Sequence, residues 1–274
     1  MPNPQLTLCV VTRNAAIGLE RTLESIHSLL ALKLSLCVEL LIIDGESTDH
    51  TSIVLDRWRR RLGPLCLLQL IVQPPSGIYP AMNLAVRQAR SPWLLFINAG
   101  DLLLDLSHIA TVLVDESPSA ADAYLFQAAL FHPGLNWALL PVTDPAPCHQ
   151  ALVYRKCLHQ RFGYYHERLQ ICSDTLFMQR LFNSGKVGYR IQPIAASEVG
   201  PRDASRDPSR ILADVALLQS IGSSLRPWRR LTLTLWCYRM ERLLGISITV
   251  WLRGLFGLIL GQYHLIRLPI LRRV

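Results

Sequence analysis

The alternation of two hydrophobic periods over the first hundred residues constrains the fold of this chain most. Continuous apolar runs, which are typical of buried strands, lie at 6–11, 39–43, 67–72 and 92–98. In the first segment between them, apolar residues recur at helical spacing: Leu19, Leu23, Ile26 and Leu30. Strand and helix therefore alternate. Strands that are apolar throughout predict an α/β fold, with a mostly parallel central sheet and helices on both faces.

Polar and small residues follow the expected strands at the edge where such sheets bind ligands. They are Thr12, Arg13 and Asn14, then Asp44 and Gln73, and finally Asn98, Ala99, Gly100 and Asp101. Each alone is an ordinary way for a strand to enter a loop, but together they favour a nucleotide-binding crevice. The chain has no G-x-G-x-x-G or Walker loop. A metal or arginines would therefore have to hold the phosphates of a nucleotide.

The middle of the chain is less regular. Residues 123–131 and 138–142 are short apolar stretches, and 173–185 predicts a helix with Ser173 as its N-cap. A turn-rich linker at 201–210 precedes a further expected helix that ends near Gly222.

The C-terminal tail, residues 225–274, carries the whole net charge of +8, because it holds nine arginines and one acid. Its charge-free runs, 243–252 and 254–266, are shorter than the roughly 20 residues that span a bilayer. The tail predicts one or two amphipathic helices that lie on an anionic membrane surface. A helical pair packed on the core or on a second subunit is the alternative. Nucleic acid is not expected as a partner, because Leu, Ile and Trp interleave with the arginines.

The seven cysteines form no C-x-x-C pair, which favours reduced thiols in a cytosolic protein. No basic residue precedes Arg13, so the N-terminus is not expected to be a signal peptide. The predicted location is cytoplasmic and peripheral, on the inner face of the plasma membrane.

Four stretches, in order, carry a resemblance to a known family: "LTLCVVTRNAAIGLERTLESI", "ELLIIDGESTDHT", "SGIYPAMNLAVRQARSPWLLFINAGD" and "CHQALVYRK…FGYYHERLQICSDTLF". Residues 5–185 resemble a family 2 glycosyltransferase of the cell-envelope polysaccharide and glycolipid type. The resemblance implies a GT-A fold. It also implies transfer of a sugar from a nucleotide diphosphate sugar to a hydroxyl of a glycan or lipid-linked acceptor, with inversion of the anomeric centre.

The resemblance also implies roles for individual residues. Those expected to bind the donor nucleotide, with a UDP-sugar as the expected donor, are Thr12, Arg13, Asn14, Asp44, Gly77, Tyr79, Asn83 and Asn98. Pro75, Ser76 and Pro80 stand where relatives commonly carry acids and a lysine. Asp44 followed by glycine is also an ordinary turn.

Asp101 matches the metal-binding acid of the family, and Mn²⁺ or Mg²⁺ is the implied cofactor. One carboxylate suffices when diphosphate oxygens and waters complete the coordination. Asp174 matches the catalytic base, which takes the acceptor proton. His149 and Gln150 match a pair that contacts the acceptor or the diphosphate. A helix cap at Asp101 and a structural role for His149 are the alternatives.

The expected division of the chain is a nucleotide-sugar-binding half at 1–105, an acceptor-binding half at 106–205, a linker helix at 206–224 and the membrane-associating tail at 225–274. A catalytically degenerate protein of the same fold, which binds a nucleotide sugar or serves as a scaffold, is the alternative function. A sugar-phosphate nucleotidyltransferase is disfavoured, because no glycine-rich loop follows the first strand.

Overall fold

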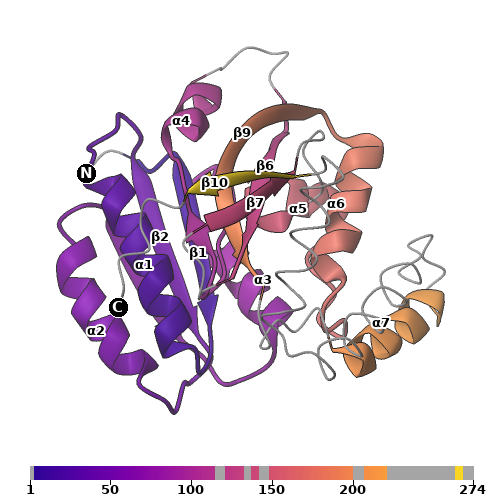
Figure 1. The fold of residues 1–274 in the computed structure, drawn as a ribbon. Coiled ribbons are helices and arrows are strands. Elements are labelled where there is room, and N and C mark those ends of the chain that lie inside the picture. The colour runs from indigo at the N-terminus through magenta and orange to yellow at the C-terminus, as the bar shows by residue number, and fades with distance from the viewer. Residues whose placement is uncertain are drawn as a thin grey trace.

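The computed structural model describes residues 3–114, 121–132, 137–141, 148–199, 207–220 and 263–267. Strands and helices alternate through its first part, as the hydrophobic periods predict (Figure 1). In chain order these elements are β1 (Leu6–Thr12), α1 (Ala16–Leu30), β2 (Val38–Asp44), α2 (Thr51–Leu62), β3 (Leu67–Val72), α3 (Ile78–Gln88) and β4 (Trp93–Phe96).

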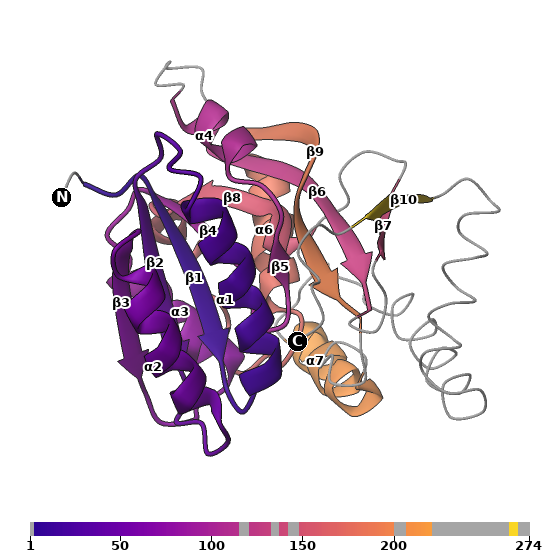
Figure 2. The same ribbon diagram turned by 60° about the vertical axis from the view of Figure 1, so that its left-hand side comes forward.

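The four strands of this part run parallel, in the order β4-β1-β2-β3. Both faces of β1 are buried, which explains its continuous apolar run. Leu8 and Val10 belong to the hydrophobic cluster of α1 and α2, whereas Cys9 and Val11 belong to the cluster of α3. Figure 2 shows α1 and α2 on one face of these strands and α3 on the other. The expected parallel sheet with helices on both faces is confirmed.

The second part adds mostly antiparallel strands to the same sheet. Its elements are β5 (Leu102–Leu103), α4 (Ser107–Leu113), β6 (Ala123–Phe131), β7 (Trp137–Pro141), the 3₁₀ turn η1 (His149–Ala151), β8 (Leu152–Arg155), α5 (Leu158–Phe162), α6 (Ser173–Ser184), β9 (Val187–Glu198), α7 (Pro208–Ser220) and β10 (Tyr263–Arg267). The sheet order is β10-β7-β6-β8-β4-β1-β2-β3. Strand β8 pairs antiparallel with β4 and joins the two parts into one sheet.

The long strand β9 connects the second part to the ligand-binding edge. It runs parallel to β6 with two register shifts, and it pairs antiparallel with β5, which follows Asp101 directly. The end of β9 at Ser197 and Glu198 therefore lies beside Asp101. Figure 1 shows the curved path that β9 takes across the sheet.

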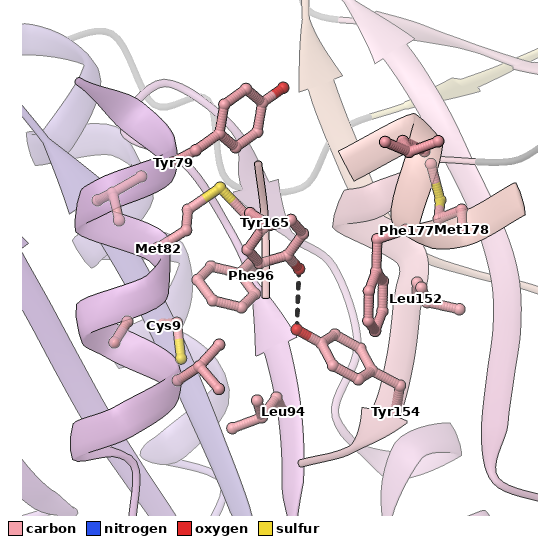
Figure 3. Packing of buried hydrophobic residues seen from close by; sticks show 14 of the residues in the cluster. Cys9, Tyr79, Met82, Leu94, Phe96, Leu152, Tyr154, Tyr165, Phe177 and Met178 are labelled. Atoms are coloured by element: carbon pink, nitrogen blue, oxygen red, sulfur yellow. Dashed lines mark hydrogen bonds between the residues drawn. The ribbon is translucent and has the colours of Figure 1, made fainter. Parts of the chain in front are cut away.

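A cluster of aromatic side chains fills the space between α3, β4 and α6 (Figure 3). The ring of Tyr165 stacks on that of Tyr79, with centroids 5.9 Å apart, and meets Phe96 edge to face at 6.0 Å. The hydroxyls of Tyr154 and Tyr165 share a hydrogen bond of 2.9 Å. This cluster supports the chain that leads into α6.

Two expectations need correction. Residues 263–267, the part of the tail that the structure describes, form strand β10, which pairs antiparallel with β7, rather than a helix. Ser173 is the first residue of α6 and not its N-cap, which is Cys172. The Ser173 hydroxyl instead accepts a hydrogen bond of 2.5 Å from the backbone N–H of His166. The rest of the tail, and with it the predicted membrane contact, lies outside the described residues.

Within the described residues, no helix has the length and apolar character needed to cross a membrane. The six cysteines of the described part are present as thiols: Cys9, Cys37, Cys66, Cys148, Cys157 and Cys172.

Candidate active site

The parallel strands β1, β2 and β4 bring Thr12, Asp44 and Asn98 to one edge of the sheet. Thr12 is paired with Asp44 in the register of β1 and β2, and the chain after β4 continues beside β1 through a bond from Ala99 N to Val11 O. Thr12 Oγ1 and Asn98 Oδ1 are buried and have no hydrogen-bond partner among the described residues. Because a buried polar atom without a partner costs about 1–3 kcal/mol, both atoms point to a ligand at this edge.

The loops after β1 and β2 hold each other. Asn14 has φ +49°, and its side-chain oxygen accepts a hydrogen bond of 2.8 Å from Thr48 N. Asp44 is buried, and its Oδ1 accepts a bond of 2.5 Å from the hydroxyl of Ser47. The exposed Arg13 lies over Gly45, where a Cβ would meet its side chain at 3.3 Å. Asp44 therefore orders its own turn here, and its contact with a donor stays a prediction.

The turn that carries Asp101 is fixed by helix α1. Gly100 has φ +116°, a conformation that favours glycine. The hydroxyl of Thr22 accepts a bond of 2.9 Å from Gly100 N and donates one of 2.7 Å to Asp101 O. Gly18 allows this close approach, because a Cβ there would lie 3.1 Å from Gly100 Cα. The turn is therefore rigid before any ligand binds.

The Asp101 carboxylate is buried and oriented by three neighbours from the second part of the chain. Its Oδ1 accepts hydrogen bonds from Glu198 N at 2.9 Å and from the Ser197 hydroxyl at 3.2 Å. Its Oδ2 accepts one of 2.9 Å from the amide of Gln150. These bonds set the direction of the carboxylate. The helix-cap alternative is not observed, because strand β5 follows Asp101 and α4 begins only at Ser107.

Glu198 also forms an ion pair with Arg21 of α1. Its carboxylate lies over Gly100, where an added Cβ would meet Oε2 at 2.9 Å. The strand end and the glycine turn therefore fit together closely, on the side of Asp101 that faces β9.

The segment 148–150 contacts Asp101 and packs against α6, the helix that carries Asp174. Gln150 bonds Asp101, and burial, together with the charges of both acids, raises the pKa of the Cys148 thiol to about 12. His149 is buried, and its ring stacks on Phe96 with centroids 5.5 Å apart. Burial lowers the pKa of His149 against the opposing charge of Asp174, so the imidazole is neutral at pH 7. Its Nε2 has no partner within the described part.

Asp174 lies in the first turn of α6, half-buried, where the helix dipole favours a negative charge. Its Oδ1 accepts a hydrogen bond of 3.1 Å from the hydroxyl of Tyr79 and one of 2.8 Å from Thr175 N. Burial, followed by the charge of Asp174, raises the pKa of Tyr79, which is therefore a neutral donor. Tyr79 thus contacts the expected base.

Asn83 is 1% exposed and holds the loop that leads to Asp174. Its amide nitrogen donates to Tyr165 O and to the carboxylate of Glu167, both at 2.9 Å, and its oxygen accepts from Tyr165 N at 2.9 Å. Gly77, with φ +110°, is the N-cap of α3, and the nearest atom to an added Cβ is 3.6 Å away. Its backbone conformation therefore explains this glycine. Donor binding by Tyr79, Asn83 and Gly77 stays a prediction.

The oxygen ligands at this turn fit a divalent cation only if a second molecule supplies further ligands. The described residues contain no group of three or more His, Cys, Asp or Glu side chains that could hold a metal. The turn does offer the Asp101 carboxylate and the unpartnered Asn98 Oδ1, which are oxygen ligands of the kind that Mg²⁺ and Mn²⁺ take. These residues therefore fit a cation that is shared with a diphosphate.

Thr22, Arg21, Ser197 and Glu198 support the site, and their roles were not predicted from the sequence. Thr22 lies 79 residues from Asp101 along the chain and Glu198 lies 97 residues from it, while Arg21 and Glu198 are separated by 177 residues. The pairing of β9 with β5 and β6 brings the strand end to the turn, and no local pattern signals that pairing.

Comparison with known proteins is consistent with this geometry. Residues 7–117 match the family model described as "Glycosyl transferase family 2". The chain is 26% identical over 243 residues to a "PGL/p-HBAD biosynthesis glycosyltransferase" of Mycobacterium bovis (strain BCG / Pasteur 1173P2), covering 86% of this chain and 91% of the relative. A protein of the same description from Mycobacterium tuberculosis (strain ATCC 25177 / H37Ra) matches equally.

Two solved structures show the same fold. The mannosyltransferase PcManGT from Pyrobaculum calidifontis, in complex with GDP-Man and Mn²⁺, aligns with a TM-score of 0.58 at 15% identity and covers 94% of this chain and 76% of its own. S. aureus TarS 1-349 in complex with UDP aligns with a TM-score of 0.55 at 17% identity, covering 89% and 75%. The match over residues 7–117, the relatives and the fold together support a family 2 glycosyltransferase, and the two solved structures show the fold.

Proposed function

We propose that this glycosyltransferase moves a sugar from a nucleoside diphosphate sugar, a UDP-sugar first of all, to a hydroxyl of a glycan or lipid-linked acceptor, with inversion. The observation that supports the proposal is that segment 148–150 bonds Asp101 through Gln150 and is close enough to Asp174 for its charge to act on Cys148 and His149. An inverting transfer needs a group that holds the leaving diphosphate and a base on the opposite side of the sugar.

Asp101 is the proposed protein ligand at the diphosphate. Its carboxylate is already oriented by Gln150 and the end of β9, so little ordering is needed when the donor binds. Gly100 allows the φ of +116° that the turn before Asp101 adopts. A bound Mn²⁺ or Mg²⁺ would neutralise negative charge on the departing diphosphate.

Asp174 is the proposed base. Its Oδ1 is held by Tyr79 and Thr175, so Oδ2 is the oxygen that takes the proton of the acceptor hydroxyl as that hydroxyl attacks C1 of the sugar. The neutral Tyr79 keeps the carboxylate in one orientation. This contact is consistent with a base whose geometry is set before the acceptor arrives.

His149 and Gln150 line the space between the two acids. The neutral imidazole of His149 can make one hydrogen bond through Nε2 to the acceptor or the diphosphate without adding charge. Thr12, Arg13, Asn14, Asp44 and Asn98 are the proposed donor contacts at the strand ends. Support for a nucleotide there comes from the unpartnered oxygens of Thr12 and Asn98 and from neighbours described with UDP, UDP-GlcNAc and GDP-Man.

The proposed acceptor class and cellular place rest on the relatives and on composition. The mycobacterial relatives are described as enzymes of PGL/p-HBAD biosynthesis, which supports a cell-envelope product. The nine arginines of residues 225–274 support contact with an anionic membrane surface from the cytoplasmic side.

The direct test measures release of nucleoside diphosphate from a panel of UDP- and GDP-sugars, with and without Mn²⁺. We expect turnover with one donor, dependence on Mn²⁺, and a loss of at least about 100-fold for Asp101→Ala. The matched control is Asp56→Asn, a change of an exposed acid on α2, which should leave the rate unchanged.

The product of a full reaction should carry the opposite anomeric configuration from the donor, which NMR of the purified glycoside measures. Retention of configuration would contradict the proposed mechanism. Tight binding of a nucleotide sugar without turnover on any acceptor would favour the degenerate binding protein instead.

A further inference from the structure

A buried carboxylate on α7 holds the chain just before the helix of the proposed base. Asp214 is 1% exposed. Its Oδ1 accepts a hydrogen bond of 2.7 Å from Gln170 N, and its Oδ2 accepts bonds of 2.8 Å from Ile171 N and 2.9 Å from Cys172 N. These three residues immediately precede α6, which carries Asp174.

The start of α6 needs such an acceptor. The first N–H groups of a helix have no partner within the helix, and Cys172, the N-cap residue, makes no side-chain cap bond. A carboxylate at this end is also favoured by the helix dipole. Asp214 therefore supplies, from another helix, an acceptor for the N–H of the N-cap residue Cys172, and it also holds the two residues before that cap.

Helix α7 is in turn fixed to the core, so the carboxylate has a defined place. Ile211, Val215 and Leu218 are buried on the face of α7 that carries Asp214, and they belong to the same hydrophobic cluster as Ile171 and Leu176. Figure 1 shows α7 close to the start of α6. The expected linker helix thus contributes a polar anchor as well as apolar contacts.

We propose that Asp214 is a positioning residue for sugar transfer. It fixes residues 170–172 and thereby the place of Asp174 relative to the acceptor hydroxyl. The inference rests on the proposed role of Asp174 as the base. Misplacement of a reacting group by about 1 Å costs roughly 100-fold in rate. Loss of the Asp214 carboxylate should therefore lower kcat and leave donor binding unchanged, because the donor contacts lie at Asp101 and at the ends of β1 and β2.

The experiment compares Asp214→Asn with Val215→Ala in the full chain. The amide introduced by Asp214→Asn would turn a donor or a weaker acceptor toward three N–H groups, whereas Val215→Ala loosens the packing of the same helix and keeps the carboxylate. We expect Asp214→Asn to lower kcat about 10- to 100-fold per folded molecule with an unchanged donor KM. Val215→Ala should lower the thermal midpoint and keep kcat.

Equal kcat per folded molecule for Asp214→Asn and the parent would overturn the inference, as would a change confined to the donor KM. If Asp214→Asn does not fold, Asp214→Glu replaces it, because the added methylene displaces the charge from the amides. Its expected result is again a lower kcat with an unchanged KM, and an unchanged kcat would overturn the inference. A parent chain without transfer on any donor would instead refute the proposed function itself.

Discussion

The hydroxyl of Thr22 offers a sharp test of how the turn at Asp101 is held. Thr22 is fully buried, and its Oγ1 bonds both Gly100 N and Asp101 O. Thr22→Val keeps the volume of the side chain and removes both bonds. Each bond lost against a buried backbone group costs about 1–3 kcal/mol, so the free energy of unfolding should fall by about 2–6 kcal/mol.

Thr22→Ser is the matched control, because it keeps the hydroxyl and loses only a buried methyl group. Its expected cost is about 1 kcal/mol. Urea unfolding of both variants gives the two free energies, and nucleoside diphosphate release gives the activity. We expect Thr22→Val to lose at least about tenfold in kcat/KM through displacement of Asp101, and Thr22→Ser to lose less than about threefold.

The relative stability losses of the two variants show whether hydrogen bonds or methyl packing hold the turn. If Thr22→Ser destabilised the chain as much as Thr22→Val, packing of the methyl group would hold the turn, and the hydrogen bonds would not. An unchanged rate in a destabilised Thr22→Val would refute the link between this turn and transfer.

Three further predictions concern the turn, a buried histidine and the tail. Gly100→Ala should lower the free energy of unfolding by about 2 kcal/mol or more, because φ is +116° and the new Cβ meets Glu198. Adding Glu198→Ala to the same chain should recover part of that loss. Additive losses of the two changes in urea unfolding would contradict this. Burial lowers the pKa of His159 from 6.5 to about 4. The unfolded chain therefore binds the proton first as the pH falls, and up to about 3 kcal/mol of stability should disappear between about pH 6.5 and 4. His159→Gln should flatten that decline, and an unaltered pH slope of the unfolding free energy would refute the assignment. Replacing three tail arginines by glutamine, while β10 is kept, should weaken co-sedimentation with anionic vesicles about 100-fold, and unchanged binding would contradict the membrane proposal. These three are Arg226, Arg229 and Arg230.

Local periodicity was sufficient to predict the first part of the fold. The stripes of α1 and the apolar runs of β1 and β2 depend on neighbours within a few residues, so the sequence shows them directly. Strand β10 could not be predicted this way, because its pairing with β7 joins residues more than about 120 positions apart. Short apolar runs in the tail are compatible with helix or strand until a partner strand is known.

The candidate site, too, was predictable from the sequence only in part. Asp101 and Asp174 could be proposed from motif and position, since Asp101 comes shortly after β4 and Asp174 lies in the first turn of α6. Their supports, Glu198 and Asp214, come from β9 and α7, whose sequences give no sign of the groups they contact. Tyr79 was expected at the nucleotide, and the structure gives it a hydrogen bond to Asp174, a contact that only the packing of α3 against α6 creates.

A single-turnover assay of Asp174→Asn with the donor bound tests directly whether Asp174 is the base of the transfer. We predict that the variant binds the nucleoside diphosphate with parent affinity, because the proposed base acts on the acceptor, and that the transfer step slows by at least about 100-fold, because the amide cannot take the acceptor proton. Transfer by Asp174→Asn at the parent rate would contradict the account.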